Sequence, residues 1–155
     1  MSITVYTEAG QRITLDPNNA IGSGGEGTVF PHPKNTDELI KVYDHPSKDH
    51  ERKLKAFIAR HFSLPKFVAA PTSLDFNGAG SVIGYTMPYV KKAKSFRDLS
   101  NKNFRISHKI NNKRVVSLYL NDAKTLEAIH NQRIVVGDRN DQNLLFVDNN
   151  SYYID

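Results

Sequence analysis

Hydrophobic and polar residues alternate along the first part of the chain with the two-residue period of β-strands. Turns containing Gly, Asn, Asp or Pro separate six such segments, which are residues 3–6, 11–15, 28–30, 39–43, 67–70 and 81–87. One stretch differs, because the apolar residues between Lys48 and Phe62 recur at the spacing of an amphipathic helix. The pattern therefore predicts a strand-rich lobe that contains one helix.

The second part of the chain is predicted to begin with a long helix and to end in a hairpin. Residues 115–130 contain neither Pro nor Gly, and helical spacing gives them one largely apolar face. That face is formed by Val115, Tyr119, Ala123, Leu126 and His130. Residues 134–136 predict a short buried strand, and residues 144–147 and 152–154 predict a hairpin around a polar turn.

Composition narrows the class of protein. The chain has 155 residues, of which 39% are apolar and 24% charged, so it can bury a core and is not of disordered composition. It contains no Cys, which excludes a disulfide framework, a thiolate metal site and a cysteine nucleophile. No apolar run approaches the roughly 20 residues that span a bilayer. We expect a cytoplasmic protein.

The net charge is +5, from 21 Lys and Arg against 16 Asp and Glu. The densest basic stretch is the amphipathic helix, with Lys48, Arg52, Lys53, Lys55 and Arg60. It is interpreted either as the solvated face of a packed helix or as a nucleic-acid footprint. No nucleic-acid-binding signature accompanies it, which favours the first interpretation.

A glycine-rich segment, residues 21–29, has the pattern G-x-G-x-x-G-x-V. Gly22, Gly24 and Gly27 allow tight turns and close approach of phosphates to main-chain N–H groups. A plain hairpin turn is the alternative. The dinucleotide-fold version of this motif opens a helix, whereas here a strand is predicted to follow.

Lys41 stands inside an otherwise apolar predicted strand. A buried ammonium is costly unless it reaches a carboxylate or a phosphate. The alternative is a lysine on an edge strand that points to solvent. Glu51 is the only Glu between Glu38 and Glu127, so it is the available carboxylate to hold Lys41.

The segment 136–146 carries Asp138 and Asn143 in a predicted loop between short strands. An Asp and an Asn five residues apart can be directed at one point, the Asp accepting a proton and the Asn offering a carbonyl oxygen to Mg²⁺. Asp155, twelve residues after Asn143, could complete the metal site. A polar surface loop is the alternative, since Asp and Asn favour turns.

Taken in order, these three segments resemble the protein kinase-like superfamily, and most closely bacterial Ser/Thr kinase-like domains. The resemblance implies an α+β protein kinase-like fold. Residues 1–87 would form an N-lobe with an antiparallel five-stranded sheet and one helix. Residues 88–155 would form a hinge near residues 87–90 and the beginning of a helical C-lobe, with the catalytic loop and a terminal hairpin.

The resemblance also implies an ATP and Mg²⁺ site. Its nucleotide-binding residues would be Gly22, Gly24 and Gly27 over the phosphates, Val29 over adenine, Lys41 on the phosphates with Glu51 as its partner, Met87 as gatekeeper and Tyr89 in the hinge. Asp138 would be the catalytic aspartate, assisted by Lys41 and Asn143. Asn143 and Asp155 would bind Mg²⁺.

Three departures from the family pattern bear on function. Val136 and Gly137 precede Asp138 where regulated eukaryotic kinases have His-Arg, so control by activation-loop phosphorylation is not expected. Asn140 replaces a lysine, and Arg139 is the nearest cation that could substitute for it. Gly137-Asp138 also resembles the loop of small-molecule phosphotransferases.

We expect a phosphotransferase that acts on Ser or Thr of a protein. The alternatives are a small-molecule phosphotransferase and a non-catalytic kinase-like module that binds nucleotide or a partner. Because the chain stops at Asp155, where the activation segment would begin, it is expected to be truncated, split or a natural remnant. A complementing C-lobe segment or a second copy of the chain is then a possible partner; a membrane is not.

Overall fold

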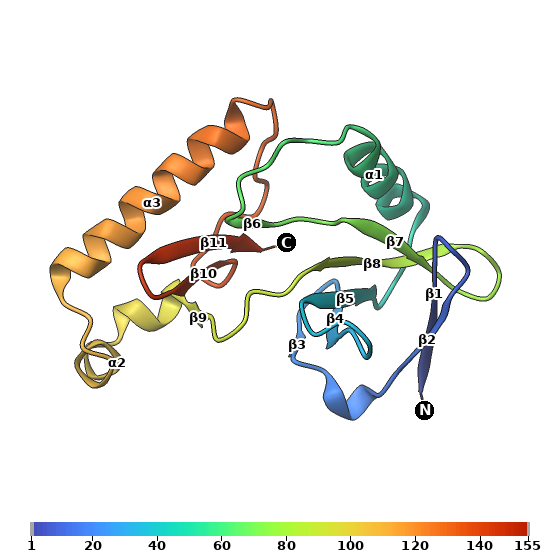
Figure 1. Ribbon diagram of the computed structural model, residues 1–155, viewed down its shortest axis with the longest axis horizontal. Helices are drawn as coiled ribbons and strands as arrows, with labels where there is room; N and C mark the ends of the chain where they lie inside the picture. Colours follow the sequence, from blue (N-terminus) through green and yellow to red (C-terminus); the bar gives the residue numbers. More distant parts are fainter. Residues whose placement is uncertain (1, 155) are drawn as a thin grey trace. The chain divides into compact units, whose positions relative to one another are not determined.

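The computed structural model describes residues 2–154, in which the chain forms two units (Figure 1). The first unit contains the residues up to Phe62 together with Pro71–Tyr89. The second contains Ser63–Ala70 together with the residues from Val90 onward. The sequence placed residues 63–70 in the first lobe, whereas the structure places them in the second unit.

Within the described residues, the first unit is built on a seven-stranded antiparallel sheet in the order β2-β1-β7-β8-β5-β4-β3. Its strands are β1 (Ile3–Thr7), β2 (Arg12–Leu15), β3 (Gly22–Ser23), β4 (Gly27–Pro31), β5 (Glu38–Tyr43), β7 (Ser73–Phe76) and β8 (Val82–Pro88). The expected five strands are too few, because the N-terminal hairpin joins the sheet through β7 and because β3 pairs with β4. A mixed α/β unit with this antiparallel sheet is compatible with a kinase-like N-lobe.

Helix α1 (Lys48–Ala59) is the one α-helix described in this unit. The side chain of Ser47 caps it by accepting from the main-chain N–H of His50, 3.1 Å away. Its buried residue Leu54 belongs to one apolar cluster of the unit, with Leu39, Leu74, Val82, Tyr85 and Met87. A second cluster contains Val5, Ile13, Leu15, Phe30, Ile40 and Val42. Leu39 and Ile40 are neighbours in β5 yet belong to different clusters, so apolar side chains pack on both faces of this strand.

The second unit contains a four-stranded sheet in the order β6-β11-β10-β9 within the described residues. Its strands are β6 (Val68–Ala69), β9 (Lys94–Ser95), β10 (Leu144–Val147) and β11 (Asn150–Ile154). Strands β10 and β11 form the terminal hairpin that the sequence predicted. Strand β6 pairs with β11 in parallel. This unit also contains the 3-10 helix η2 (Phe96–Ser100) and the α-helices α2 (Lys102–Ser107) and α3 (Asn112–His130), while the 3-10 helix η1 (Pro17–Asn19) belongs to the first unit.

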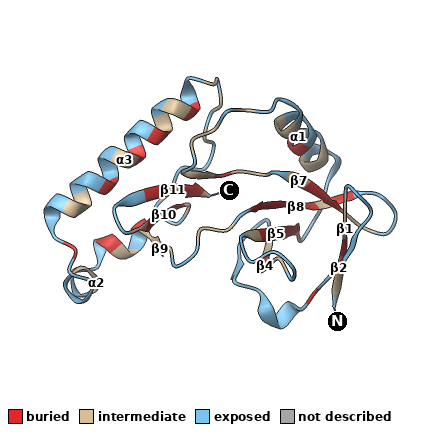
Figure 2. Cartoon of the chain, in the orientation of Figure 1, coloured by how far each residue is buried: buried red, intermediate tan, exposed pale blue. Residues whose placement is uncertain are grey.

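Helix α3 buries a different face from the one predicted. Its buried residues are Leu118, Asp122, Thr125 and Ile129, which recur along one side of the helix (Figure 2). Tyr119, assigned to the apolar face from the sequence, is 48% exposed. The shift arises because two of the four buried residues are polar, so the apolar residues alone mark the wrong stripe.

The predicted strand at residues 134–136 is also wrong. These residues form no strand, and Val135 is 83% exposed. Ile134 and Val136 pack at the edge of the core of the second unit, whose buried residues include Leu118, Phe146 and Tyr153. A three-residue apolar run therefore reflects packing of two side chains here rather than sheet pairing.

Across residues 2–154, no helix combines the length and apolar composition that crossing a membrane requires.

Candidate functional site

Lys41 is a buried lysine in the interior of a sheet. It lies in β5, opposite Val29 of β4 and Tyr85 of β8, and only 5% of its surface is exposed. Its Nζ is 5.8 Å from the centre of the Tyr85 ring. The alternative of a solvent-facing lysine on an edge strand is therefore wrong. A buried ammonium in this position must be balanced by negative charge or by hydrogen bonds.

Lys41 forms an ion pair with Glu26. The Glu26 Oε2 lies 3.8 Å from the Lys41 Nζ, and the Glu26 side chain is 68% exposed. Glu51 instead binds Lys48 and Lys55, at 3.2 and 2.6 Å, within α1. These two lysines, Lys55 first, hold the pKa of Glu51 below its usual range. The expected Lys41–Glu51 pair is thus not the one that the structure shows.

The glycine-rich segment contains one glycine that the sheet itself requires. A Cβ on Gly27 would collide with the carbonyl oxygen of Val42, because β4 and β5 approach closely there. A Cβ on Gly22 or Gly24 would meet nothing within 4 Å. Open space above Gly22 and Gly24 is what a phosphate-binding loop needs. A structural requirement therefore explains Gly27, whereas packing does not explain the other two.

The residues expected around adenine lie in, or directly after, the two strands that flank β5. Met87 is buried opposite Leu39 in β8, and Val29 is half-buried in β4. The main-chain N–H of Tyr89 donates to the carbonyl of Asp37 at 2.8 Å. This donor is engaged within the first unit, so a hinge hydrogen bond from Tyr89 N–H to adenine would require that bond to break.

In the second unit, the loop of Asp138 is held together by side-chain amides. Asn140 Nδ2 donates to Asp138 Oδ1 at 2.9 Å, and Asn143 Nδ2 donates to Asp138 Oδ2 at 3.0 Å. The main-chain N–H groups of Gln142 and Asn143 donate to Asn140 Oδ1. We call these contacts the amide network. The structure thus brings Asp138 and Asn143 into direct contact, with Asn140 as a third member.

The far end of this loop is tied to the sheet of the second unit. The carbonyl of Asp141 accepts from Ser95 Oγ at 2.7 Å and from the main-chain N–H of Arg97 at 3.0 Å. Both donors lie where β9 passes into η2. The loop between Asp138 and Asn143 is therefore a fixed polar turn. Asp155, the remaining predicted metal ligand, lies outside the described residues.

Arg139 does not take the place of the lysine that the family pattern has near the transferred group. Its Nη2 donates to Asp122 Oδ2 at 2.5 Å, and its Nε donates to the Tyr153 hydroxyl at 3.2 Å. The Asp122 side chain is 1% exposed and lies on α3. Burial is the main cause that raises the pKa of Tyr153 to about 12, and hydrogen bonding to Asp122 adds to it.

Sequence reasoning missed Glu26, Asp122 and Tyr153 as members of these clusters, and Gly84 as a structural residue. A Cβ on Gly84 would collide with the carbonyl oxygen of Lys41, so this glycine lets β8 pack against β5 beside the buried lysine. An isolated Gly inside a predicted strand is a signal of close backbone approach. Asp122 falls four residues after Leu118 and seven before Ile129, which is the spacing that could have found it.

The basic helix α1 carries its own counter-charges. Asp49 binds Arg52 and Lys53, each at 2.6 Å, in addition to the pairs of Glu51. Hydrogen bonds from Lys53 and then Arg52 hold the pKa of Asp49 below its usual range. The cations of α1 thus form ion pairs along the helix surface, as expected for a solvated face.

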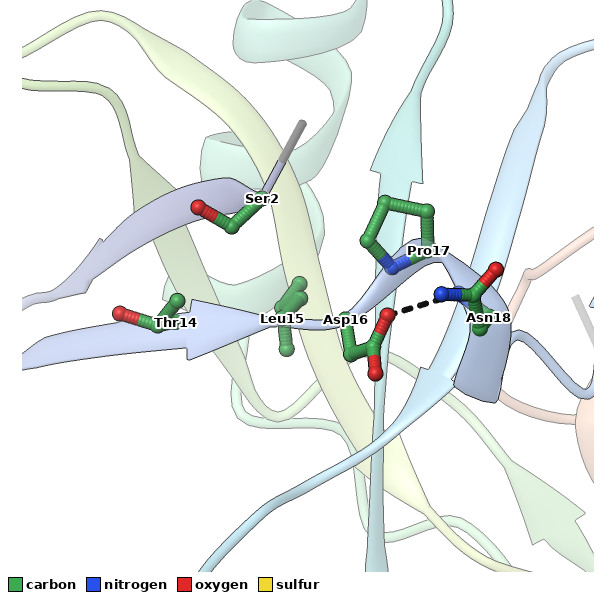
Figure 3. A pocket seen from close by; sticks show the side chains of 6 residues that line it. All are labelled: Ser2, Thr14, Leu15, Asp16, Pro17 and Asn18. Carbon is green, nitrogen blue, oxygen red and sulfur yellow. Dashed lines mark hydrogen bonds between the residues drawn. The ribbon is translucent and has the colours of Figure 1, made fainter.

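A pocket of about 270 Å³ lies beside the end of β2 and η1, lined by Ser2, Thr14, Leu15, Asp16, Pro17 and Asn18 (Figure 3). Asp16 Oδ1 already accepts from the main-chain N–H of Asn18 at 2.9 Å, capping η1. None of the residues predicted for the nucleotide or the metal lines this pocket.

Each unit, taken by itself, carries polar groups with a chemistry of its own. Lys41 supplies a buried cation beside the glycine-rich segment in the first unit. In the second unit, Asn143 uses its Nδ2 on Asp138, so its carbonyl oxygen is the atom suited to a hard cation. Asp138 supplies a carboxylate whose two oxygens are oriented by amides.

Comparison with known proteins gives one distant relative of kinase type. Protein kinase YegI of Escherichia coli O157:H7 is 28% identical to the chain over 167 residues, an alignment that covers 99% of the chain and 26% of YegI. The chain therefore spans about a quarter of the length of the curated relative that it matches. No family model matches the chain. The similarity supports a kinase-like relationship.

Proposed function

We propose that the protein is an ATP- and Mg²⁺-dependent phosphotransferase of kinase-like type that phosphorylates Ser or Thr of a protein. The observation that carries the proposal is the buried Lys41, whose ammonium lies beside a glycine-rich segment in which Gly22 and Gly24 border open space. This arrangement suits a polyphosphate, because a buried cation and main-chain N–H groups are the usual ligands of phosphate oxygens.

In the first unit, Lys41 would bind phosphate oxygens and neutralise part of their charge. Its position is fixed by pairing of β5 with strands on both sides, so little reorganisation is needed when phosphate arrives. Phosphate would replace Glu26, which is exposed and can move to solvent. Val29 and Met87 would contact the base of the nucleotide.

In the second unit, Asp138 would orient the acceptor hydroxyl and accept its proton. The amide network directs both carboxylate oxygens, which favours one orientation of the acid for proton transfer. Asn143, together with Asp155, would hold Mg²⁺. When bound, Mg²⁺ neutralises charge that develops on the phosphate oxygens.

A protein acceptor is proposed from the kinase relationship and from the resemblance to bacterial Ser/Thr kinase-like domains. YegI is named a protein kinase, which supports a protein as the class of acceptor. A small-molecule phosphotransferase would use the same Asp138 and Asn143 chemistry on a different hydroxyl.

The test combines nucleotide binding with transfer. We expect Mg-ATP to raise the melting temperature of the chain, and radiolabel from γ-labelled ATP to enter a Ser/Thr-containing protein substrate. Lys41→Ala should weaken Mg-ATP binding by about tenfold or more, because a buried charge-assisted contact is lost. Asp138→Asn should retain binding and lower the transfer rate by about 100-fold, since it loses the proton acceptor.

Lys53→Ala is the matched control for Lys41→Ala, because it removes a lysine whose side chain is 71% exposed on α1. It should leave binding and transfer unchanged. If Mg-ATP neither binds nor stabilises the unmutated chain, the proposal is wrong. Binding without any transfer would instead support a non-catalytic nucleotide-binding module.

A further inference from the structure

Arg139 joins the loop of Asp138 to two other elements of the second unit. Its guanidinium donates to the carboxylate of Asp122 on α3 and to the hydroxyl of Tyr153 on β11, at 2.5 and 3.2 Å. It stands between Asp138 and Asn140, which both belong to the amide network. A single side chain thus connects the loop to a helix and to a strand.

Asp122 explains why this contact is firmly placed. Its side chain is 1% exposed within the core of the second unit, and a buried carboxylate requires a counter-charge. Arg139 supplies that charge from the loop side, with 42% of its side chain exposed. The planar guanidinium has donors in fixed directions, so two simultaneous bonds define its orientation as well as its position.

We propose that Arg139 is a positioning residue that anchors the loop of residues 138–143 and thereby orients Asp138. One end of the loop is held by Arg139 on Asp122 and Tyr153. The other end is held by the Asp141 carbonyl on Ser95 and Arg97. Because the loop is held at these two places, its side-chain amides can form the hydrogen bonds of the amide network in only one arrangement. If one of these anchors is released, Asp138 loses its fixed orientation. The rate of group transfer is sensitive to such a displacement.

The first measurement follows the loop itself and does not depend on activity. The main-chain N–H groups of Gln142 and Asn143 donate to Asn140 Oδ1 and make no contact with Arg139 in the hydrogen bonds described. In Arg139→Ala, we expect hydrogen exchange at these two amides to accelerate by about tenfold, because local opening becomes easier. The main-chain N–H of Ser151, which donates to Asn121 Oδ1 on α3, reports whether the unit remains folded.

The second measurement follows the reaction and rests on the proposed function. We expect Arg139→Ala to lower kcat by about 10- to 100-fold with little change in the KM for ATP, because orientation of Asp138 is lost while Lys41 is untouched. Arg139→Lys should recover only part of kcat, since one ammonium cannot reproduce both directed bonds.

Arg114→Ala is the matched control. Arg114 lies in α3 and, like Arg139, connects this helix to another segment of the second unit, through two bonds to the Asp148 carbonyl at 2.7 and 3.2 Å. Removing it should leave exchange at Gln142 and Asn143 and kcat unchanged. Where Arg139→Ala does not fold because Asp122 is left unpaired, the double variant Asp122→Asn with Arg139→Gln removes both charges and is measured instead.

The outcomes separate the two proposals. Unchanged loop exchange and unchanged kcat in a folded Arg139 variant would overturn the anchor while leaving the proposed function intact. Accelerated exchange in a chain that transfers no phosphoryl group would support the anchor and contradict the proposed function. Equal effects of Arg114→Ala and Arg139→Ala would show general loosening of the unit and would also overturn the anchor.

Discussion

Lys41 and Glu26 form a contact that phosphate would have to break. The Glu26 side chain is 68% exposed, and its Oε2 lies 3.8 Å from the Lys41 Nζ. An ion pair with so exposed a partner contributes at most about 1 kcal/mol. If phosphate binds Lys41 as proposed, Glu26 would therefore be a weak competitor for the same cation.

Glu26→Gln should consequently tighten Mg-ATP binding. We expect the dissociation constant to fall by about threefold to fivefold, which corresponds to removing a competitor worth about 1 kcal/mol. Isothermal titration calorimetry measures the change. Glu127→Gln, an exposed residue of α3, alters the net charge equally and should leave affinity unchanged. Equal or weaker binding by Glu26→Gln would show that Glu26 does not compete with phosphate.

Asp75 is a buried carboxyl group within the sheet of the first unit. It is fully buried, and its Oδ2 accepts from Thr86 Oγ1 at 3.0 Å. Burial is the largest cause that raises the pKa of Asp75 from 3.8 to about 6; the Thr86 hydrogen bond opposes this, and the charges of Glu8 and Glu38 add to it. The folded protein thus binds this proton more tightly than the unfolded chain does.

The sign of the resulting pH dependence follows directly. A carboxyl whose pKa is higher in the folded state stabilises the fold below the unfolded pKa, and that stability is lost as pH rises from about 4 to about 6. Between pH 5 and pH 7.5 we expect Asp75 to remove about 1 kcal/mol of the free energy of unfolding. Asp75→Asn should abolish this part of the dependence in urea titrations. The same pH dependence in both proteins would contradict the assignment.

At the scale of an element, helix α3 combines structural and positioning roles on one face. Leu118 and Ile129 are buried in the core of the second unit, while Asp122 lies between them and binds Arg139. Asn121, the next residue back, accepts from both the N–H and the hydroxyl of Ser151 in β11, at 2.8 Å each. The helix therefore supports the loop and the terminal hairpin at the same time.

Leu118→Ala tests the buried face. Leu118 is fully buried, so its truncation should lower the free energy of unfolding by about 2–5 kcal/mol through lost burial and a remaining cavity. Leu120→Ala is the control, because Leu120 is 60% exposed on the same helix and its loss should cost less than about 0.5 kcal/mol. Similar losses for the two variants in chemical denaturation would show that the buried face is assigned wrongly.

Two glycines allow close strand pairing in the first unit, and only one of them belongs to the glycine-rich motif. Gly27 belongs to the glycine-rich motif and Gly84 to a plain strand, yet each allows a neighbouring strand to approach β5. The motif pattern identified only the first. A glycine of the G-x-G-x-x-G-x-V pattern can thus also meet a packing requirement.

At the scale of the molecule, the net positive charge is divided unequally between the two units. The first unit holds slightly more acidic than basic residues, so the whole positive excess lies in the second unit. The densest basic stretch, in α1, therefore lies in the unit that carries no positive excess. Any charge-driven attraction to a polyanion would therefore be expected from the second unit.

Local patterns predicted the elements that depend on local rules. The strands β1, β2, β4, β5 and β8, helix α1 and the terminal hairpin all lie within a few residues of their predicted positions. Strand β7 was missed because a buried Asp75 interrupts its apolar pattern, and β6 was placed in the wrong unit because its partner β11 is distant in the sequence. Periodicity carries no information on such long-range pairing.

For the candidate site, the sequence predicted which residues to consider more readily than it predicted their side-chain contacts. Lys41, Asp138 and Asn143 stood out because a Lys inside an apolar strand is costly and because the three motifs follow one another in the order of a known family. The contacts of Lys41 with Glu26 and of Arg139 with Asp122 depend on side-chain direction across elements, which spacing alone does not specify. The nucleotide, metal and acceptor roles remain predictions for the experiments above.

Strand β6 also has a consequence for how the protein is made. Val68 lies opposite Tyr153, and the carbonyl of Phe67 accepts from the Tyr153 N–H. More than half of the chain separates these partners, so β6 leaves the ribosome long before the strand that it pairs with. During synthesis, the β6 segment stays unpaired with β11 until that strand has been made. An unpaired strand edge is prone to non-native association. The second unit can therefore close its sheet only after the residues between β6 and β11 have been synthesised.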